Sequence, residues 1–389
     1  MVAAAGDYQR LAQENAALKA QLHNVGLEFI DARKRLEAME RAKTAKLSDI
    51  EQRYLSRRSL ILLPRLMPLL PGGERVVIVD GGAREVDQDT RWQAFPPDRL
   101  RFFGFEADPT EAERLNAMPS IGGLERRFYP AGLWGTTGSA CFEHNKASGG
   151  SSFLRQNRAV TDRWKFENPT QAVRSPEMFH PVRYEDLPVV TIAEWAERTG
   201  VRAVDFLKLN VQGGELEVLR GAGPMLDSML GVLTEVAFVE SYLDRPMFSD
   251  IDAHLRARGF VFFDLLAHHY IGRATAPVAA QHLTVAEPRL SRQVSAWGQL
   301  IEGHALYLRD PIAAGSAAIE PIRAIKLAAL AEALGQVEYA FELLEWLQQR
   351  TDVADTPLGD GVKEAIREAA QIYASMVPPE LRDLSAGSA

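Results

Sequence analysis

The chain has 389 residues, of which 46% are hydrophobic and 25% charged, a composition that fits a globular protein with one large core or two domains. Its formal net charge of -8 gives no support for a nucleic-acid surface, and we expect no nucleic-acid partner. The only cysteine, Cys141, excludes an intrachain disulfide and a cysteine-based zinc site. We therefore expect no metal site, a reducing cytoplasmic location, no secretory signal and no transmembrane segment.

Residues 1–58 are predicted to be helical, because 7–54 contain no proline and only one glycine, Gly26. Apolar residues recur every seven positions at Leu11, Leu18, Val25, Ala32 and Met39, with Leu22, Phe29 and Leu36 at the second seam position. This a/d heptad pattern predicts a coiled coil, and we expect a homo-oligomer through residues 8–50. The alternative is a solitary amphipathic helix that lies on its own domain.

Residues 59–312 are predicted to form one α/β domain, because β-rich apolar runs alternate there with helical patterns. The predicted strands lie near 75–80, 101–106, 126–131, 189–192, 203–209, 231–239, 259–265 and 304–309. The predicted helices lie near 109–118, 214–222 and 249–258. Asp108 and Pro109 form a good helix start, with Asp108 as the cap and Pro109 in the first turn.

Two further regions depart from the strand-helix alternation. The stretch 135–188 is rich in Gly, Ser, Asn and Pro and shows no clear periodicity, and we interpret it as a lid or acceptor-binding insertion rather than a passive loop. Residues 313–389 are predicted to be a helical extension with a flexible tail. In that extension two short helices flank Gly335 and a third covers 360–375, which favours a helical cap or a dimer contact.

Three predicted strands end in polar side chains or glycines, at the edge of a parallel sheet where ligands bind. The residues concerned are Asp80, Gly81 and Gly82, then Glu106, and then Asn210, Gly213 and Gly214. Glycine lets the backbone turn tightly or approach a ligand closely, and an acidic residue such as Glu106 can accept hydrogen bonds from both ribose hydroxyls of an adenosine. The complete dinucleotide fingerprint is absent, because Val86 stands where a further glycine is expected. A nucleotide-sugar or NAD-linked enzyme on a similar sheet stays open as a rival.

Taken in order, these segments resemble the FkbM family of S-adenosylmethionine-dependent methyltransferases over roughly 74–312. The stretches that carry the resemblance are 76–83, 104–109, 129–135, 150–154, 234–240, 258–260 and, above all, Phe206-Leu-Lys208-Leu-Asn210-Val-Gln-Gly213-Gly-Glu215 with its continuation to Ala222. The resemblance implies a Rossmann-like class I methyltransferase sheet, mostly parallel, with one antiparallel edge strand. It also implies S-adenosyl-L-methionine as cofactor and methyl transfer to a hydroxyl of a glycan, lipid-linked sugar or secondary metabolite.

The resemblance also implies where the site residues lie. The expected cofactor contacts are Asp80, Gly81, Gly82, Glu106, Ala107, Gly132, Leu133 and Asn210. An alcohol acceptor needs a general base, for which Glu235 and His144 are the candidates, while Asn210 positions acceptor or cofactor. We expect Lys208 to pair with Glu215 or Glu235.

Two departures from the family pattern leave a second function open. Family members commonly carry Asp where this chain has Asn210, and a more glycine-rich first loop where it has Arg84-Glu85-Val86. The bulk at 84–86 is expected to narrow the methionine end of the pocket. The alternative function is therefore a catalytically inactive methyltransferase-fold scaffold that acts through its coiled coil.

Overall fold

The computed structural model describes residues 60–84, 91–119, 121–164, 167–168, 173–174, 179–271, 282–283, 294–295, 299–313 and 319–376. Residues Leu60–Ala389 form one compact unit. The predicted coiled coil and the predicted C-terminal tail lie outside the described residues, and both stay predictions.

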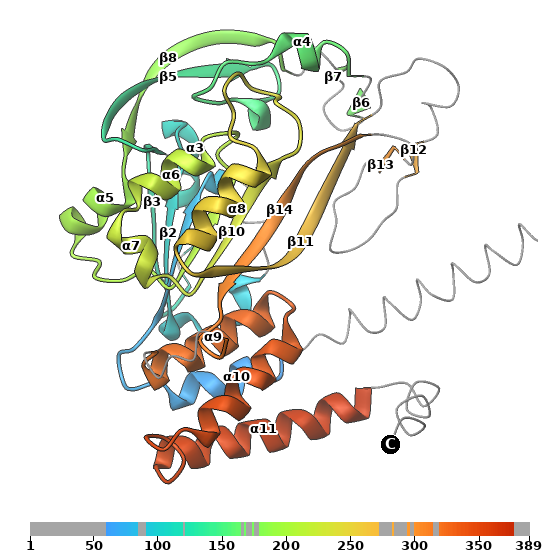
Figure 1. The fold of residues 1–389 in the computed structure, drawn as a ribbon. Coiled ribbons are helices and arrows are strands. Elements are labelled where there is room, and N and C mark those ends of the chain that lie inside the picture. The colour runs from blue at the N-terminus through green and yellow to red at the C-terminus, as the bar shows by residue number, and fades with distance from the viewer. Residues whose placement is uncertain are drawn as a thin grey trace, which may run out of the picture. The chain divides into compact units, whose positions relative to one another are not determined.

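A seven-stranded sheet with the order β11-β14-β10-β9-β1-β2-β3 forms the centre of this unit (Figure 1). Its strands are β1 (Val76–Gly81), β2 (Leu100–Phe105), β3 (Glu125–Tyr129), β9 (Phe206–Leu209), β10 (Gly231–Ala237), β11 (Phe260–Ile271) and β14 (Gln299–Arg309). Strands β3, β2, β1, β9 and β10 pair in parallel, which confirms the α/β fold class and the mostly parallel sheet.

The sheet has one antiparallel strand as expected, but the expectation that it lies at the edge is wrong. The antiparallel strand is β14, which pairs with both β10 and β11 and is therefore internal. Its residues 305–308 are fully buried, as expected of a strand with a neighbour on each side and a helical layer on each face. The strand at this edge of the sheet is β11, which extends to Ile271, beyond its predicted end.

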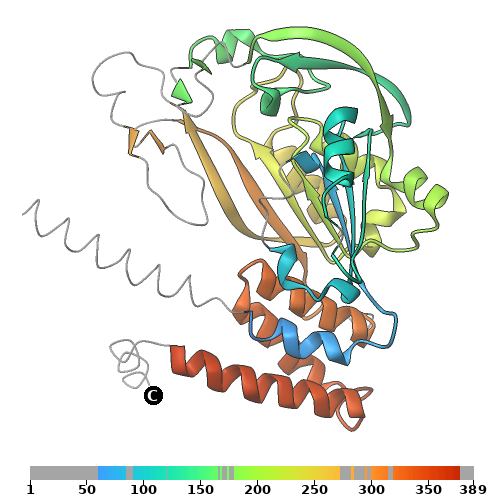
Figure 2. The ribbon, with the colours of Figure 1, turned by 180° about the vertical axis from the view of Figure 1, so that it is seen from behind.

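Alternate residues of each central strand pack into different helical layers. Val77 and Val79 face one core, and Val76 and Ile78 face the other. The first layer contains α5 (Ile192–Thr199), α6 (Glu215–Gly221), α7 (Pro224–Ser228) and α8 (Phe248–Ala257). The second, seen from behind in Figure 2, contains α2 (Leu63–Leu66), α3 (Pro109–Asn116), α9 (Pro321–Ala333) and α10 (Val337–Gln349). Asp108 caps α3 as predicted, because its side chain accepts hydrogen bonds from the N–H groups of residues 110 and 111.

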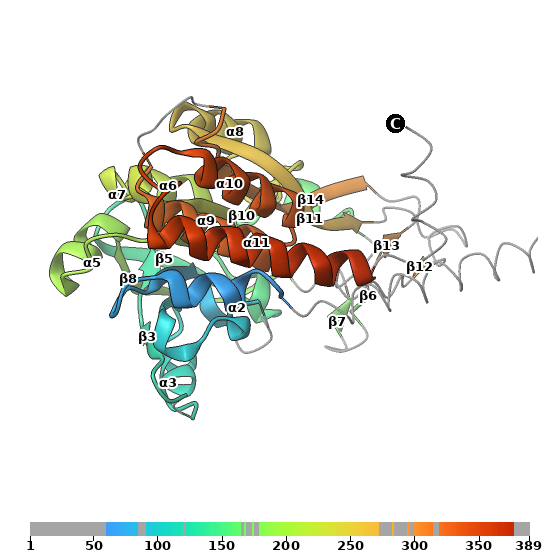
Figure 3. The same cartoon turned by 90° about the horizontal axis from the view of Figure 1, so that it is seen from below.

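The C-terminal helices continue the second layer at the amino ends of the strands. Helices α9 and α10 flank Gly335, and α11 (Pro357–Met376) follows, so the three predicted helices are confirmed (Figure 3). In α9 the ten residues Ala324–Ala333 are all buried. Helix α9 is therefore part of the main core. None of the described helices is both long and apolar enough to cross a membrane.

The stretch 135–188 contains more regular structure than its sequence pattern predicts. Strand β8 (Pro181–Val190) lies between β4 (Gly132–Leu133) and β5 (Gly138–Asn145) in a three-stranded sheet. Val182 and Tyr184 of β8 are exposed, so this sheet lacks the apolar alternation that reveals a half-buried strand.

The remaining short elements of the described residues are four 3₁₀ turns, one helix and two pairs of short strands. The turns are Met67–Leu69, Trp92–Ala94, Pro97–Arg99 and Ser148–Gly150, and the helix is α4 (Arg158–Thr161). The strand pairs are β6 (Glu167–Asn168) with β7 (Val173–Arg174), and β12 (His282–Leu283) with β13 (Val294–Ser295).

Candidate active site

The carboxyl ends of β1, β2 and β9 meet at one wall of a cavity of ≈ 280 Å³. The predicted residues that line this cavity are Gly82, Glu106, Ala107, Gly132, Leu133, His144 and Asn210. They come from separate segments that the parallel register brings together. A cavity between the strand ends and an inserted sheet is where ligands bind in open α/β folds.

Gly82 turns the chain sharply after β1 and brings it against the end of β9. Its φ is +80°, and a Cβ built on it would lie 1.9 Å from the carbonyl oxygen of Asn210. Its N–H donates to the carbonyl of Phe105 at 3.0 Å, which ties the loop to the end of β2 as well. Only glycine fits here, and the backbone itself forms the cavity wall.

Glu106 presents a buried carboxylate at the end of β2, with 7% of its surface exposed. One of its oxygens accepts a hydrogen bond from the N–H of Asp108 at 3.0 Å. Burial raises the pKa of Glu106, and the Asp108 N–H and the nearby Arg84 guanidinium offset part of that rise. This is the side chain expected to bind ribose hydroxyls.

Arg84 extends toward the acidic end of the cavity. Its guanidinium lies 3.0 Å from the carboxylate of Asp108 and 3.6 Å from that of Glu106. The bulk at 84–86 was expected to narrow the methionine end; Arg84 lines the cavity beside Glu106, and Glu85 and Val86 lie outside the described residues. Any ribose at Glu106 would share this carboxylate with Arg84.

Asp80 and Gly81 are not among the cavity-lining residues, but they pack against residues that line it. Asp80 is 1% exposed, and its carboxylate lies 2.8 Å from the ammonium group of Lys208. Lys208 also donates to the carbonyl of Gly82 at 3.2 Å, so its expected pairing with Glu215 or Glu235 is wrong. A Cβ on Gly81 would lie 2.8 Å from Leu209, which shows how closely β1 and β9 pack.

His144 lies on the opposite wall, which the inserted sheet forms. Its Nε2 is 3.1 Å from the carboxylate of Glu185 on the adjacent strand β8. The ring of Phe142, another cavity residue, meets the imidazole edge-on at 4.9 Å. A carboxylate that orients an imidazole beside a cavity is the arrangement of an acid-base pair. The sequence contains no motif that identifies Glu185, because the pairing of β5 with β8 alone brings it to His144.

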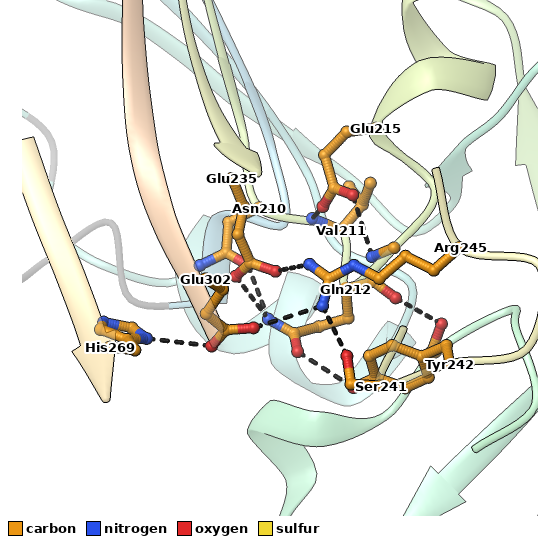
Figure 4. A network of polar contacts seen from close by, with 12 residues as sticks. Asn210, Val211, Gln212, Glu215, Glu235, Ser241, Tyr242, Arg245, His269 and Glu302 are labelled. Atoms are coloured by element: carbon orange, nitrogen blue, oxygen red, sulfur yellow. Dashed lines mark hydrogen bonds and ion pairs between the residues drawn. The ribbon is translucent and has the colours of Figure 1, made fainter. Parts of the chain in front are cut away.

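Glu235 is not among the cavity-lining residues, because it faces a buried network behind the wall (Figure 4). Its carboxylate forms an ion pair with Arg245, and both side chains are 1% exposed. Arg245 also reaches Glu302 at 3.3 Å, and Glu302 lies 2.9 Å from Nδ1 of His269. The proposed role of Glu235 as a general base therefore has no support from the geometry.

The charges of this network shift one another's pKa values. Burial, followed by the charge of Glu302, raises the pKa of Glu235 to about 8. Burial also acts on Glu302, but hydrogen bonding and charge from His269 together with Arg245 lower its pKa to about 2. The pKa of His269 is raised by Glu302 despite the opposing effect of burial. Arg245 and Glu302 carry no recognisable sequence signal, because only tertiary packing brings them to Glu235.

Residues 89–262 match the family model of the methyltransferase FkbM domain. The chain carries an FkbM methyltransferase domain. The matched range begins after β1 and ends within β11, so Gly82 precedes it and Glu106, His144, Asn210 and Glu235 lie inside it. The FkbM family is S-adenosylmethionine-dependent. No curated protein matches the sequence.

Solved structures similar to this chain share little sequence with it. A pericyclic reaction enzyme is 9% identical with a TM-score of 0.28, covering 64% of this chain and 47% of that chain. LepI in complex with SAM is 9% identical with a TM-score of 0.27, covering 64% and 46%, so the chain spans about half the length of these two proteins. An S-adenosylmethionine-dependent methyltransferase from Mesorhizobium loti is 11% identical with a TM-score of 0.25, covering 63% of this chain and 96% of that chain.

The cavity of the FkbM domain fits the cofactor that the family uses. Glu106 supplies a buried acceptor for ribose hydroxyls, and Gly82 lets the cavity wall pass close to the end of β9, where a Cβ would clash with the Asn210 carbonyl. Gly132 is equally constrained, because a Cβ there would lie 2.4 Å from the ring of Phe153. Glu106, Gly82, Gly132 and Leu133 are thus the residues that would hold the adenosine part.

Proposed function

We propose that this chain transfers a methyl group from S-adenosylmethionine to a hydroxyl group of a glycan, lipid-linked sugar or secondary metabolite. The observation that supports an alcohol acceptor is the pair of His144 and Glu185 on the wall opposite the cofactor-binding strand ends. An alcohol has a pKa far above 7, so its attack requires a base that removes the hydroxyl proton.

In this mechanism His144 takes the proton from the acceptor hydroxyl. Because Nε2 of the imidazole is held by Glu185, the other ring nitrogen is the one available to the acceptor. When bound, S-adenosylmethionine would supply an activated methyl group, which would pass from its sulfonium to the acceptor oxygen and leave S-adenosylhomocysteine. The protein contributes alignment of the two reactants and exclusion of water.

The acceptor side of the cavity has the chemistry that hydroxylated compounds require. Phe142 and Phe153 offer aromatic surface, Ser148 and Ser151 offer hydroxyls, and Arg183 adds a cation. All of them belong to the inserted segment, while the cofactor residues belong to the central sheet or to β4. This division supports the interpretation of 135–188 as an acceptor-binding insertion.

The test has two steps. Calorimetric titration with S-adenosylmethionine, S-adenosylhomocysteine and NAD should show binding of the first two only. Labelled methyl transfer should then be screened against glycans and hydroxylated metabolites, and His144→Ala should lower kcat by about 10²–10⁴-fold while S-adenosylhomocysteine binds unchanged.

His180→Ala is the matched control, because His180 also belongs to the insertion but is not among the cavity-lining residues. Equal loss of activity in both variants would remove His144 from the mechanism. Failure of the folded protein to bind either adenosyl ligand would favour the inactive scaffold, with Arg84 at Glu106 as the first suspect.

A further inference from the structure

The wall that the insertion contributes to the cavity carries a positive charge that the proposed mechanism does not use. Strands β5 and β8 lie at the top of Figure 1, above the central sheet, and their directly paired residues share one face. His144 pairs with Arg183 and Phe142 with Glu185, so all four side chains lie on the same face. Phe142, His144 and Arg183 line the cavity. Arg183 therefore lies beside the expected base, on the wall where the acceptor would bind.

The acceptor side of the cavity lining has a positive charge and no negative one. Among the described residues of 135–188, Arg183 is the one lysine or arginine that lines the cavity, and no aspartate or glutamate of that stretch does. The carboxylates that line the cavity belong to Glu106 and Asp108 on the other side, where Arg84 lies 3.6 and 3.0 Å from them. A cavity wall with one sign of charge attracts ligands of the opposite sign. This distribution favours an acceptor that carries negative charge.

Arg183 is held only weakly by its present partner. Its guanidinium lies 3.1 Å from Oε2 of Glu185, and the two side chains are 61% and 42% exposed. An ion pair this exposed contributes little to stability, because water screens both charges. The same oxygen of Glu185 also lies 3.1 Å from Nε2 of His144, whose side chain is only 14% exposed. Two donors thus share one carboxylate oxygen, and Arg183 is the donor that is free to turn toward a ligand.

A guanidinium at this position is suited to a carboxylate or a phosphate. Its N–H groups form a rigid fork that matches two oxygens of such a group with two parallel hydrogen bonds. When Arg183 turns to this anion, Glu185 keeps His144 as its partner and no longer shares its oxygen. Because both side chains reach the same oxygen of Glu185, their two sites are close enough for one small hydroxylated molecule to occupy both.

We propose that the methyl acceptor is an anionic hydroxyl compound, whose carboxylate or phosphate is bound by Arg183 next to the hydroxyl that His144 deprotonates. The inference rests on the proposed function, since it concerns the acceptor of the same methyl transfer. In that transfer the hydroxyl oxygen gains the methyl group and loses its proton to His144, while the anionic group is unchanged. Uronic acids supply the carboxylate and sugar phosphates the phosphate. Arg183 is then the residue that selects the acceptor by its charge.

The experiment measures the binding of four probes by ligand-observed NMR titration, with the protein saturated with S-adenosylhomocysteine. D-Glucuronate and D-glucose 6-phosphate carry the anion, and the methyl ester of D-glucuronate and D-glucose are their neutral counterparts. At least one anion should bind with a Kd about 10-fold or more below that of its counterpart. The pair that shows this preference distinguishes a carboxylate from a phosphate. Arg183→Met should bring the two Kd values of that pair to within about twofold of each other.

Arg158→Met is the matched control for the loss of an exposed arginine. Arg158 also belongs to the insertion, and its side chain is 55% exposed and lies 3.2 Å from that of Asp162, which is 42% exposed. It is not among the cavity-lining residues, so this variant should keep the wild-type preference. Arg183→Lys keeps the charge but loses the fork, and it should keep part of the preference. All three variants change exposed side chains and should unfold at the wild-type temperature.

The failures of this inference and of the proposed function are distinguishable. Equal Kd values for the anions and their neutral counterparts, or binding of none of the four probes, would overturn the inference. A preference that Arg183→Met retains would also overturn it, because the anion would then bind elsewhere. Labelled methyl transfer to a neutral hydroxyl compound would still support the proposed function in each of these cases. Failure of the folded protein to bind S-adenosylhomocysteine would overturn the proposed function, and this inference with it.

Discussion

The amino and the carboxyl ends of the central sheet both bury charged side chains, but they compensate the charge in different ways. At the amino ends Asp205 is 1% exposed, lies 2.9 Å from the ammonium group of Lys326 on α9, and accepts the N–H of Val77 at the same distance. Glu332, also on α9, accepts the N–H groups of residues 61, 62 and 63 at 2.6–2.8 Å. Lys326 also lies 2.5 Å from Glu74, but the Glu74 side chain is 42% exposed, so Asp205 is the one deeply buried carboxylate at this ammonium group.

At the carboxyl ends the carboxylates share their partners. Glu235 and Glu302 both contact Arg245, and Glu302 needs His269 as a second cation. The pKa values of Glu235, Glu302 and His269 are displaced as a result. Shifted pKa values are typical of functional sites. The comparison teaches that buried charge at one end of the sheet joins a helix to the strands, while at the other end it shifts pKa values behind a cavity wall.

The largest effect is expected from Lys326→Met at the amino ends. Removing the ammonium group leaves the carboxylate of Asp205 buried without its nearest cation, so the free energy of unfolding should fall by about 3–5 kcal/mol. Urea titration measures this change. Lys363→Met is the control, since Lys363 is exposed and should change stability by less than about 0.5 kcal/mol.

The affinity of the folded Lys326→Met variant for S-adenosylhomocysteine should equal that of the wild type. A large loss of affinity would break the comparison, because it would show that the two ends of the sheet are coupled.

The next effect concerns the acidic end of the cavity. Glu106→Ala should weaken S-adenosylhomocysteine binding by about 1–3 kcal/mol, because a charged acceptor for the ribose hydroxyls is lost. Calorimetry checks this with Glu113→Ala, an exposed residue of α3, as the control, and equal affinity in both variants would remove Glu106 from the site.

A smaller effect should appear in the pH dependence of stability. The folded-state pKa of His269 is raised above 6.5, so its contribution is complete below about pH 6.5 and is lost as pH rises through the folded value. Glu235 acts in the same direction, because its pKa of about 8 makes the folded state bind more protons than the unfolded state between about pH 4.5 and 8. The free energy of unfolding should therefore fall from about pH 4.5 to 8, and more steeply above about pH 6.5, where His269 adds to Glu235.

His269→Gln should flatten part of this decline, whereas His180→Gln in the insertion should leave it unchanged. The pKa of Glu302, about 2, places its loss of stability at acid pH, outside this window. A decline of equal slope in wild type and His269→Gln would contradict the assignment of the network.

Deletion of residues 1–54 should change neither the stability nor the ligand affinity that depend on the two ends of the sheet. The deletion should lower the oligomer mass measured by light scattering, because the heptad pattern predicts the subunit contact. Thermal stability and S-adenosylhomocysteine affinity should be those of the full chain. An unchanged mass would disprove the coiled-coil prediction.

The sequence alone determined most of the sheet and one side of the site. Short apolar runs that end in Asp80-Gly81-Gly82, Glu106 and Asn210 marked the strand ends, because local periodicity and glycine placement reflect strand structure directly. Parallel strands place their carboxyl ends at one edge, so these residues were expected together, and Gly82, Glu106 and Asn210 do share one cavity.

Only the tertiary structure decided that β14 is internal and that Lys208 pairs with Asp80. It also decided that Glu235 does not line the cavity and that Glu185 lies beside His144. Each depends on a pairing between segments far apart in the chain, and such pairings leave no periodic trace in one sequence. Gln212 illustrates the limit: its position in the strongest motif was visible, but its positive φ and its contact to Glu235 arise only when the turn after β9 packs beside β10. The local propensity of each residue can be read from the sequence. The orientation of a side chain at a site depends on neighbours that only the folded structure brings to it.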